Sequence, residues 1–248
     1  MNRTPPSGER SPFAETLATA AVGAALAGAV GSLLGVAVPA ALIGGANGAI
    51  CGRRRIYDWR SAKGVAAFAL DSSWALTTTA AGLMAHGVAA VRGAAEFAPQ
   101  LSERQNRHVY GRGFQPRKGF AITLGNVVNG AGDLTRPRRA KLVTDHEDVH
   151  VWQARVFGPT YPVLYLGWAI GAGAAGGVIW ATSRRDERFT KVVESCAYYL
   201  NPFEWWAYSR DDHWPPVGKL DQLGWKRPAV RSFASLRGDP APNQGASQ

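Results

Sequence analysis

The sequence predicts a mainly α-helical membrane protein with a minor β component (α+β). A glycine-rich N-terminal helical hairpin precedes a small domain with a short β-sheet and a metal-binding helix. Three observations lead to this fold class. Residues 16–50 carry no charge, and this run is longer than the roughly 20 residues that one membrane span needs. Residues 107–110 and 119–128 alternate between apolar and polar side chains, as strands do. Residues 146–150 read His-Glu-Asp-Val-His, an HExxH motif.

The uncharged run is expected to fold into two short helices, about 14–35 and 38–52, because Pro39 interrupts it between glycines that favour a turn. Small residues recur every four positions on both helices, at Gly23, Ala27, Gly31 and Gly35, then at Gly44, Gly48 and Gly52. This spacing lets helix backbones approach closely in lipid. We therefore expect a membrane hairpin with a glycine zipper, which could also join copies of the chain into a homo-oligomer. The alternative is one long Ala/Gly-rich segment lying on a soluble core.

Basic residues flank the apolar runs. The net charge is +10, but the chain has no nucleic-acid-binding motif, and its arginines follow apolar runs at residues 53–60 and 184–188. Arginines are placed in this way at the cytoplasmic ends of membrane helices. We therefore expect membrane lipid as a partner, and no nucleic acid. The loop at residues 53–63, with Tyr57 and Trp59, is expected at the membrane interface.

Two further apolar stretches follow the hairpin. Residues 64–95 are interrupted by Asp71 and His86. Asp71 leaves residues 72–91 as a candidate span, and a semi-buried helix covering the metal-binding domain is an equal alternative. His86 is expected to be a satisfied core histidine and not a ligand. Residues 161–182 are uncharged, with aromatic ends and glycines in the middle, which suits either a span or a bent, re-entrant segment.

The chemistry of the chain centres on residues 144–153, Thr-Asp-His-Glu-Asp-Val-His-Val-Trp-Gln. On a helix, His146 and His150 share one face, so both imidazoles can reach one metal ion. Glu147 lies beside them, where it can act as a general base towards a water molecule at the metal. Gln153 falls on the same face and can hydrogen-bond a ligand or the substrate. Asp148 is expected to point away from this face.

A catalytic zinc site takes three protein ligands and leaves the fourth position open. The best candidate for the third ligand is Glu204, in the sequence Asn-Pro-Phe-Glu, on a helix for which Asn201 is a good N-cap. Alternatively Glu204 only caps its helix, because Asn201 and Glu204 have the spacing of a capping box. Thr144 and Glu147 have the same spacing. Other candidates for the third ligand are Glu194, Asp211 and His213.

These motifs resemble those of small bacterial zincins, the gluzincin-like membrane metallopeptidases. The resemblance covers about residues 119–212 and rests on three motifs in this order: His146-Glu147-x-x-His150-x-x-Gln153, Gly158-Pro159-x-Tyr161, and Asn201-x-x-Glu204-x-x-Ala207. The sequence departs from the family pattern at residues 148–149, where zincin helices are more apolar and often carry glycine. The whole chain also resembles a family of actinobacterial membrane proteins.

The resemblance implies a zinc ion (Zn²⁺) held by His146, His150 and Glu204 in a zincin-like domain, with Glu147 as the general base. Gln153 and Asn201 are expected to support the ligands. The implied function is a membrane-associated zinc metallopeptidase acting on a peptide or protein substrate, which the strand at residues 119–128 could hold in extended form. The alternative is a non-catalytic membrane scaffold or interaction protein. Its glycine-spaced hairpin would be the working part, and its metal site would be vestigial or structural.

The expected domain order follows from these assignments: a disordered leader at 1–12, a membrane region at 13–96, a zincin-like metal-binding domain at 97–216 with the inserted apolar segment 161–182, and a polar, largely disordered tail at 217–248. We expect the protein in the bacterial cell membrane, multi-pass or partly re-entrant, with the active site at the cytoplasmic face. If residues 161–182 crossed the bilayer in a straight line, His150 and Glu204 would lie on opposite sides of the membrane. The two could meet only if this segment is re-entrant, if the helix after Lys191 comes back into the membrane, or if the site lies at membrane depth. We expect a bent or partly submerged segment, and the alternative is that Glu204 is not a ligand.

Overall fold

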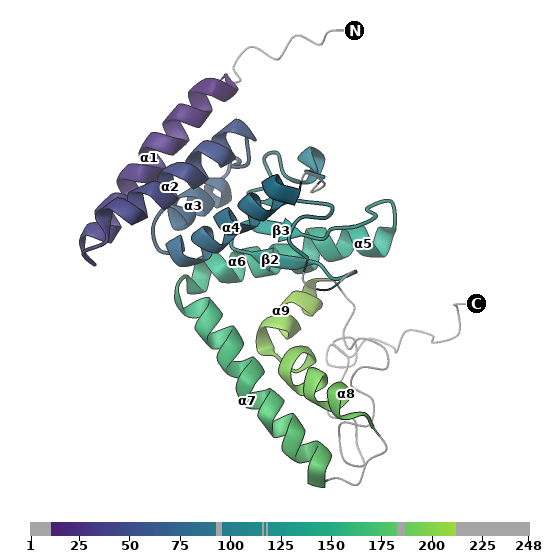
Figure 1. Ribbon diagram of the computed structural model, residues 1–248. Helices are drawn as coiled ribbons and strands as arrows, with labels where there is room; N and C mark the ends of the chain where they lie inside the picture. Colours follow the sequence, from purple (N-terminus) through teal and green to yellow (C-terminus); the bar gives the residue numbers. More distant parts are fainter. Residues whose placement is uncertain (1–10, 93–95, 116, 118, 183–186, 212–248) are drawn as a thin grey trace. The chain divides into compact units, whose positions relative to one another are not determined.

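The computed structural model describes residues 11–92, 96–115, 117, 119–182 and 187–211 (Figure 1). These residues are mainly helical with a small three-stranded sheet, which agrees with the predicted fold class. Two helices, α1 (Pro12–Ser32) and α7 (Thr160–Thr182), are long and apolar enough to cross a membrane. The predicted tail and nearly all of the predicted leader lie outside the described residues.

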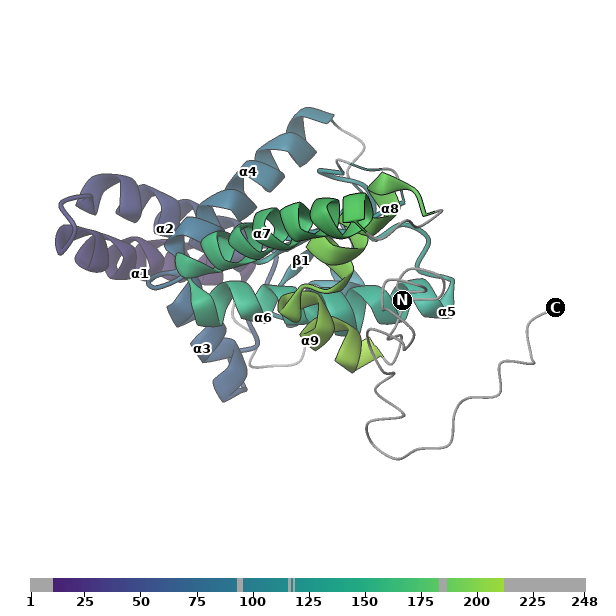
Figure 2. The same cartoon turned by 90° about the horizontal axis from the view of Figure 1, so that it is seen from below.

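Contacts along the chain divide it into two compact units, residues 1–162 and 163–248. In the first unit, α1 and α2 (Ala37–Arg53) lie side by side as an antiparallel hairpin (Figures 1 and 2), which confirms the two helices expected at this position. A side chain at Gly48 would collide with the backbone of Thr19, whose hydroxyl donates a hydrogen bond to the Gly48 carbonyl (2.7 Å). The glycines thus let the two helices of the hairpin touch, and a homo-oligomer through them stays a prediction.

The base of the hairpin is fastened to the rest of its unit by a buried carboxylate. Glu15 accepts hydrogen bonds from Arg104 Nη2 (2.7 Å) and from Trp59 Nε1 (2.8 Å). Tyr57, expected at a membrane interface, is instead fully buried, and its hydroxyl donates to Asp71 Oδ2 (2.9 Å). The loop after α2 is therefore part of the core of the unit, and only Trp59 and the basic residues beside it reach the surface.

The second apolar stretch forms α3 (Ala62–Asp71) and α4 (Leu76–Arg92), which meet at an angle of 87° and could be a broken span or a re-entrant pair. The bend follows Asp71, whose carboxylate is buried and receives two hydrogen bonds from Arg155. α4 also packs against the sheet, which favours the predicted alternative of a helix that covers the domain. His86, on α4, is buried with its Nδ1 2.8 Å from the Tyr110 hydroxyl, as expected for a core histidine.

The sheet has three strands where the sequence predicted two. A short 3₁₀ turn, η1 (Pro99–Leu101), precedes it. The strands are β1 (His108–Val109), β2 (Ile122–Leu124) and β3 (Val127–Asn129). β3 lies in the middle, parallel to β1 and antiparallel to β2. The expected single strand at 119–128 is split because Gly125 adopts a positive φ of 57° and turns the chain back on itself. β2 consequently forms one edge of the sheet.

The helix that carries the HExxH motif begins before Thr144, although Thr144 and Glu147 have the spacing of a capping box. α5 (Pro137–Lys141), η2 (Leu142–His146) and α6 (Glu147–Phe157) follow one another without a break. η2 is a π-helical turn, in which the Glu147 N–H donates to the Leu142 carbonyl five residues back. Thr144 therefore lies inside a helix, and its reading as the cap of Glu147 is wrong. The helix ends at Gly158, which has a positive φ of 52°.

The second unit is an antiparallel helical pair. Its return segment comprises α8 (Phe189–Glu194), a second π-helical turn η3 (Ser195–Tyr199) and α9 (Pro202–Asp211). This segment runs back along α7 (Figure 1) through successive contacts, which are Trp180 Nε1 with the Glu187 carbonyl, Gly176 against Cys196, and the Tyr165 hydroxyl with Glu204. The chain thus returns to the first turns of α7.

Candidate metal site

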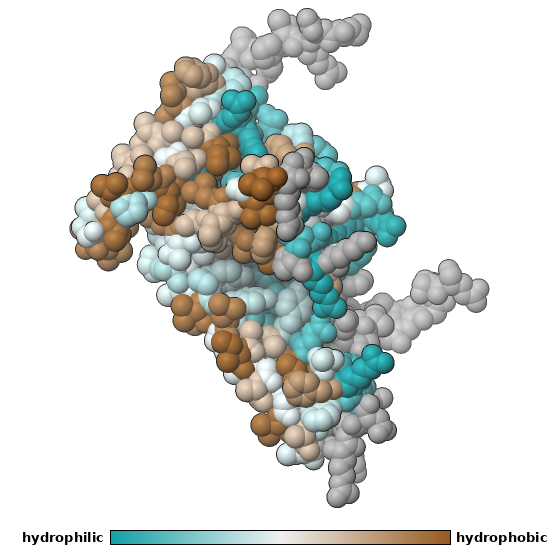
Figure 3. All heavy atoms as spheres, viewed as in Figure 1, coloured by the Kyte–Doolittle hydropathy of each residue, from teal (hydrophilic) through white to brown (hydrophobic). Residues whose placement is uncertain are grey.

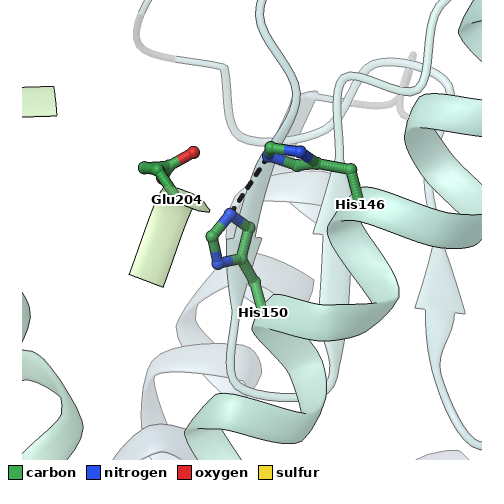
Figure 4. Close-up of side chains that lie close together, drawn as sticks. All are labelled: His146, His150 and Glu204. Carbon is green, nitrogen blue, oxygen red and sulfur yellow. Dashed lines mark hydrogen bonds between the residues drawn. The ribbon is translucent and has the colours of Figure 1, made fainter. Parts of the chain in front are cut away.

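Two histidines of the HExxH motif lie next to each other on one side of the helix, with their ring planes at 77°. His146 is the last residue of η2 and His150 lies on α6, and both are buried. Their Nε2 atoms are 3.2 Å apart (Figure 4). Two nitrogen ligands of one tetrahedral zinc ion, each about 2.0–2.1 Å from the metal, lie about 3.3–3.4 Å apart. The pair therefore has nearly the spacing that a shared metal ion requires.

A side-chain amide fixes the proton of the second histidine. Gln153 Oε1 lies 2.8 Å from His150 Nδ1. Because an amide oxygen can only accept, Nδ1 carries the hydrogen and the lone pair of Nε2 faces His146. The Tyr161 hydroxyl donates to the same Gln153 oxygen (3.2 Å). Gln153 thus lies where the sequence expected it, and its partner is the candidate ligand His150.

Glu147 is held by the edge strand of the sheet. The Thr123 hydroxyl, from the middle of β2, donates to Glu147 Oε2 (2.7 Å), and the carboxylate is buried. Sequence reasoning missed Thr123. Threonine is common in strands because its branched side chain fits the pleated surface, so a threonine in a strand gives no separate signal of a functional role. The bond brings β2 and the expected general base together.

Ion pairs on the opposite side of α6 set its rotation. Asp148 pairs with Arg107 and lies 3.6 Å from Lys63 Nζ, so it points away from the histidine face, as predicted. Two turns later, Arg155 Nε and Nη2 donate to Asp71 Oδ1 and Oδ2, each at 2.8 Å. These partners explain why a helix with charged residues at such positions can still be buried.

Glu204 lies on α9, and the alternative that it only caps this helix is wrong. Asn201 is the N-cap, with its Oδ1 accepting from the Phe203 N–H (3.0 Å). A capping box would direct the Asn201 N–H to Glu204, but that N–H donates to the Tyr198 carbonyl (3.0 Å). The Glu204 carboxylate instead accepts from the Tyr165 hydroxyl (2.7 Å). Asn201 therefore supports the candidate ligand by starting its helix.

His146, His150 and Glu204 form a buried group that could hold a metal ion. One ligand atom from each lies within 4.8 Å of the others (Figure 4). Among the described residues this is the one such group of three. Glu194, which ends α8, is not a member of it, and the side chain of Asp211 and all of His213 lie outside the described residues. Two imidazoles and one carboxylate are a donor set that zinc accepts.

Comparisons of the chain with protein-family models, with curated proteins and with solved structures found no match. The resemblance to zincins therefore remains a prediction from the motifs.

Proposed function

We propose that this chain is a membrane-associated zinc metallopeptidase of the gluzincin type. The observation that carries the proposal is the histidine pair, with Nε2 atoms 3.2 Å apart and the proton of His150 directed away from His146 by Gln153. Gln153 leaves the lone pair of His150 Nε2 turned towards His146 Nε2, where a shared metal ion would lie. The two α-helices that could cross a membrane support the membrane association.

In peptide hydrolysis, each residue of the candidate site would have its own role. A bound zinc ion would supply Lewis acidity for the scissile carbonyl and lower the pKa of a coordinated water to about 7. Glu147 would take a proton from the attacking water and later give it to the leaving amine. Thr123 would hold the Glu147 carboxylate in place during both transfers. The backbone of β2, at the edge of the sheet, offers hydrogen bonds to an extended substrate.

Metal analysis of the detergent-purified full chain tests the proposal. We expect about one zinc per chain in the wild type, and none in His146→Ala or Glu204→Ala. Glu147→Gln is the matched control, because it should keep both metal and fold while losing hydrolysis of a quenched peptide library. An intact wild-type fold without stoichiometric divalent metal would refute the proposal. Loss of zinc in His146→Ala alone would move the third ligand away from Glu204.

The non-catalytic scaffold is distinguished by the same variants. It requires Glu147→Gln to be silent in every assay. It also places function in the glycines of the hairpin, several of which are already covered by the neighbouring helix, as Gly48 is by Thr19.

A further inference from the structure

We propose that the tip of the α1–α2 hairpin inserts into the hydrocarbon of one membrane leaflet and does not cross the bilayer. The tip projects away from the rest of its unit (Figure 2), and hydrophobic residues gather over the hairpin (Figure 3). Leu33 and Leu34 are 84% and 75% exposed, and Val38 on the other side of the turn is 71% exposed. This inference is independent of the metal site.

The lower part of the hairpin is already occupied by protein. On α1, a side chain at Gly23 would lie 3.5 Å from Ser72 Oγ, so this helix touches the rest of the unit as far as residue 23. On α2, Asn47 belongs to the polar core of the unit, with its Nδ2 donating to the Tyr57 hydroxyl (3.1 Å) and its Oδ1 accepting from Asn126 (3.0 Å). Residues before Gly23 and after Asn47 therefore cannot lie in lipid without taking the core of the unit with them.

The part left to project is too short to span a membrane. Residues 24–32 of α1 and 37–46 of α2 extend about 14 Å and 15 Å at roughly 1.5 Å per residue. The hydrocarbon core of a bilayer is about 30 Å thick. The length of α1 alone allows a crossing, but its attached base leaves a reach of about half the bilayer.

The chemistry of the tip suits a water-free environment. The amide N–H groups of residues 33–36 all donate to backbone carbonyls of residues 30–32, at 2.8–3.2 Å. In lipid a backbone polar group needs such an internal partner, which the N–H groups of the turn have and the carbonyls of residues 33–35 do not. Gly35, with a φ of 71°, makes the turn without a polar side chain, and the Ser32 hydroxyl is bonded to the Ala29 carbonyl (2.7 Å). Turns that face water are usually built from polar residues, and this one is Leu-Leu-Gly-Val.

The opposite end of the hairpin has the residues that suit lipid headgroups. Arg53 ends α2, the loop that follows exposes Arg60 and part of Trp59, and Lys63 is exposed at the start of α3. Tryptophan and basic residues collect at the membrane interface, and basic residues are attracted to anionic lipids. The apolar tip and the basic residues at the opposite end of the hairpin together indicate that a lipid bilayer, and not a second protein, covers this surface.

The test uses the full chain added to preformed vesicles of phosphatidylcholine and phosphatidylglycerol, with an NBD fluorophore on Leu34→Cys. Arg60→Cys is the matched control at the base, and the wild type gives the background from the buried Cys51 and Cys196. We expect lipids brominated in mid-chain to quench the Leu34 label severalfold more than the Arg60 label. External dithionite should reduce the Arg60 label at least tenfold faster.

Three results would overturn the inference. Rapid reduction of the Leu34 label by external dithionite would place the tip in water, and rapid reduction by dithionite trapped inside the vesicles would show a crossing. Protection of the label without quenching by brominated lipid would show a protein partner, such as a second copy. Val38→Cys, on the other side of the turn, repeats the measurement at a second exposed position and guards against a fault peculiar to Leu34.

Discussion

Removing the carboxylate of Asp71 should destabilise the first unit strongly, because it breaks the link between the apolar helices and the HExxH helix. Arg155 is fully buried and places its Nε and Nη2 on the two Asp71 oxygens at 2.8 Å. The same carboxylate accepts from Tyr57 and Asn126. Asp71→Ala therefore leaves a buried guanidinium without its counterion, removes the acceptor of the Tyr57 hydroxyl, and takes one of two side-chain oxygen acceptors from Asn126.

The magnitude follows from the burial. Breaking a buried ion pair by removing one partner costs about 3–5 kcal/mol, because the remaining charge stays desolvated. For a unit of this size, 1 kcal/mol shifts the melting temperature by about 2–4 °C, so Asp71→Ala should lower it by roughly 6–20 °C. Replacing both partners, in Asp71→Leu with Arg155→Met, should cost less than the single change, since no buried charge is left alone.

Thermal unfolding in detergent, followed by circular dichroism, measures the effect. Lys63→Ala is the control on the same helix, because Lys63 is largely exposed and lies 3.6 Å from Asp148, where such a pair is worth about 0–1 kcal/mol. A fall of less than 2 °C for Asp71→Ala, or a double variant less stable than the single one, would refute the reasoning.

Three further predictions test other contacts. Gln153→Leu should weaken zinc binding about 10–100-fold in a competition titration with a chelator, the usual loss when the partner of a ligand histidine is removed; an unchanged affinity would contradict the assigned tautomer. Gly48→Val should lower the melting temperature because its side chain would meet the Thr19 backbone, whereas Gly87→Ala, with open space around it, should not. Burial lowers the pKa of His108 well below its usual range, so the unfolded chain takes up a proton that the folded chain excludes, and stability should fall as pH falls below about 6.5. With a chelator present, His108→Gln should reduce this fall between pH 7.5 and 5, and an equal fall in both proteins would count against it.

The hairpin and the HExxH helix could be predicted because their signals are local. Pro39 and the spacing of glycines mark two helices in residues 16–50, and His146 and His150 share a face on any helix. The sheet was less predictable, because the split at Gly125 depends on a backbone angle that a glycine permits without requiring it. The start of the helix at Pro137 was hidden by η2, because a π-helical turn has no clear sequence signal.

Partners distant in sequence could not be predicted from the motif. Asp71 looked like an interruption of a membrane span, and its partner Arg155 lies 84 residues away. Thr123 and Tyr165 carry no signal of their own, yet they accompany Glu147 and Glu204. Gln153 could be predicted, because it lies three residues after His150 and helix geometry alone places the two side chains on one face.

The return of the chain along α7 removes the main objection to Glu204 as a ligand. A straight crossing by residues 161–182 would have carried the following residues to the far side of a membrane. Instead Gly176 lets the return segment approach closely, with a side chain at this position falling 3.0 Å from Cys196 Cβ, and the segment runs back until Glu204 meets Tyr165. Tyr165 lies in the second turn of α7. Glu204 therefore lies near the N-terminal end of α7, which is the end connected to α6. Whatever depth α7 reaches in a bilayer, its partner helices reach it too, and a crossing by α7 does not remove Glu204 to the opposite side.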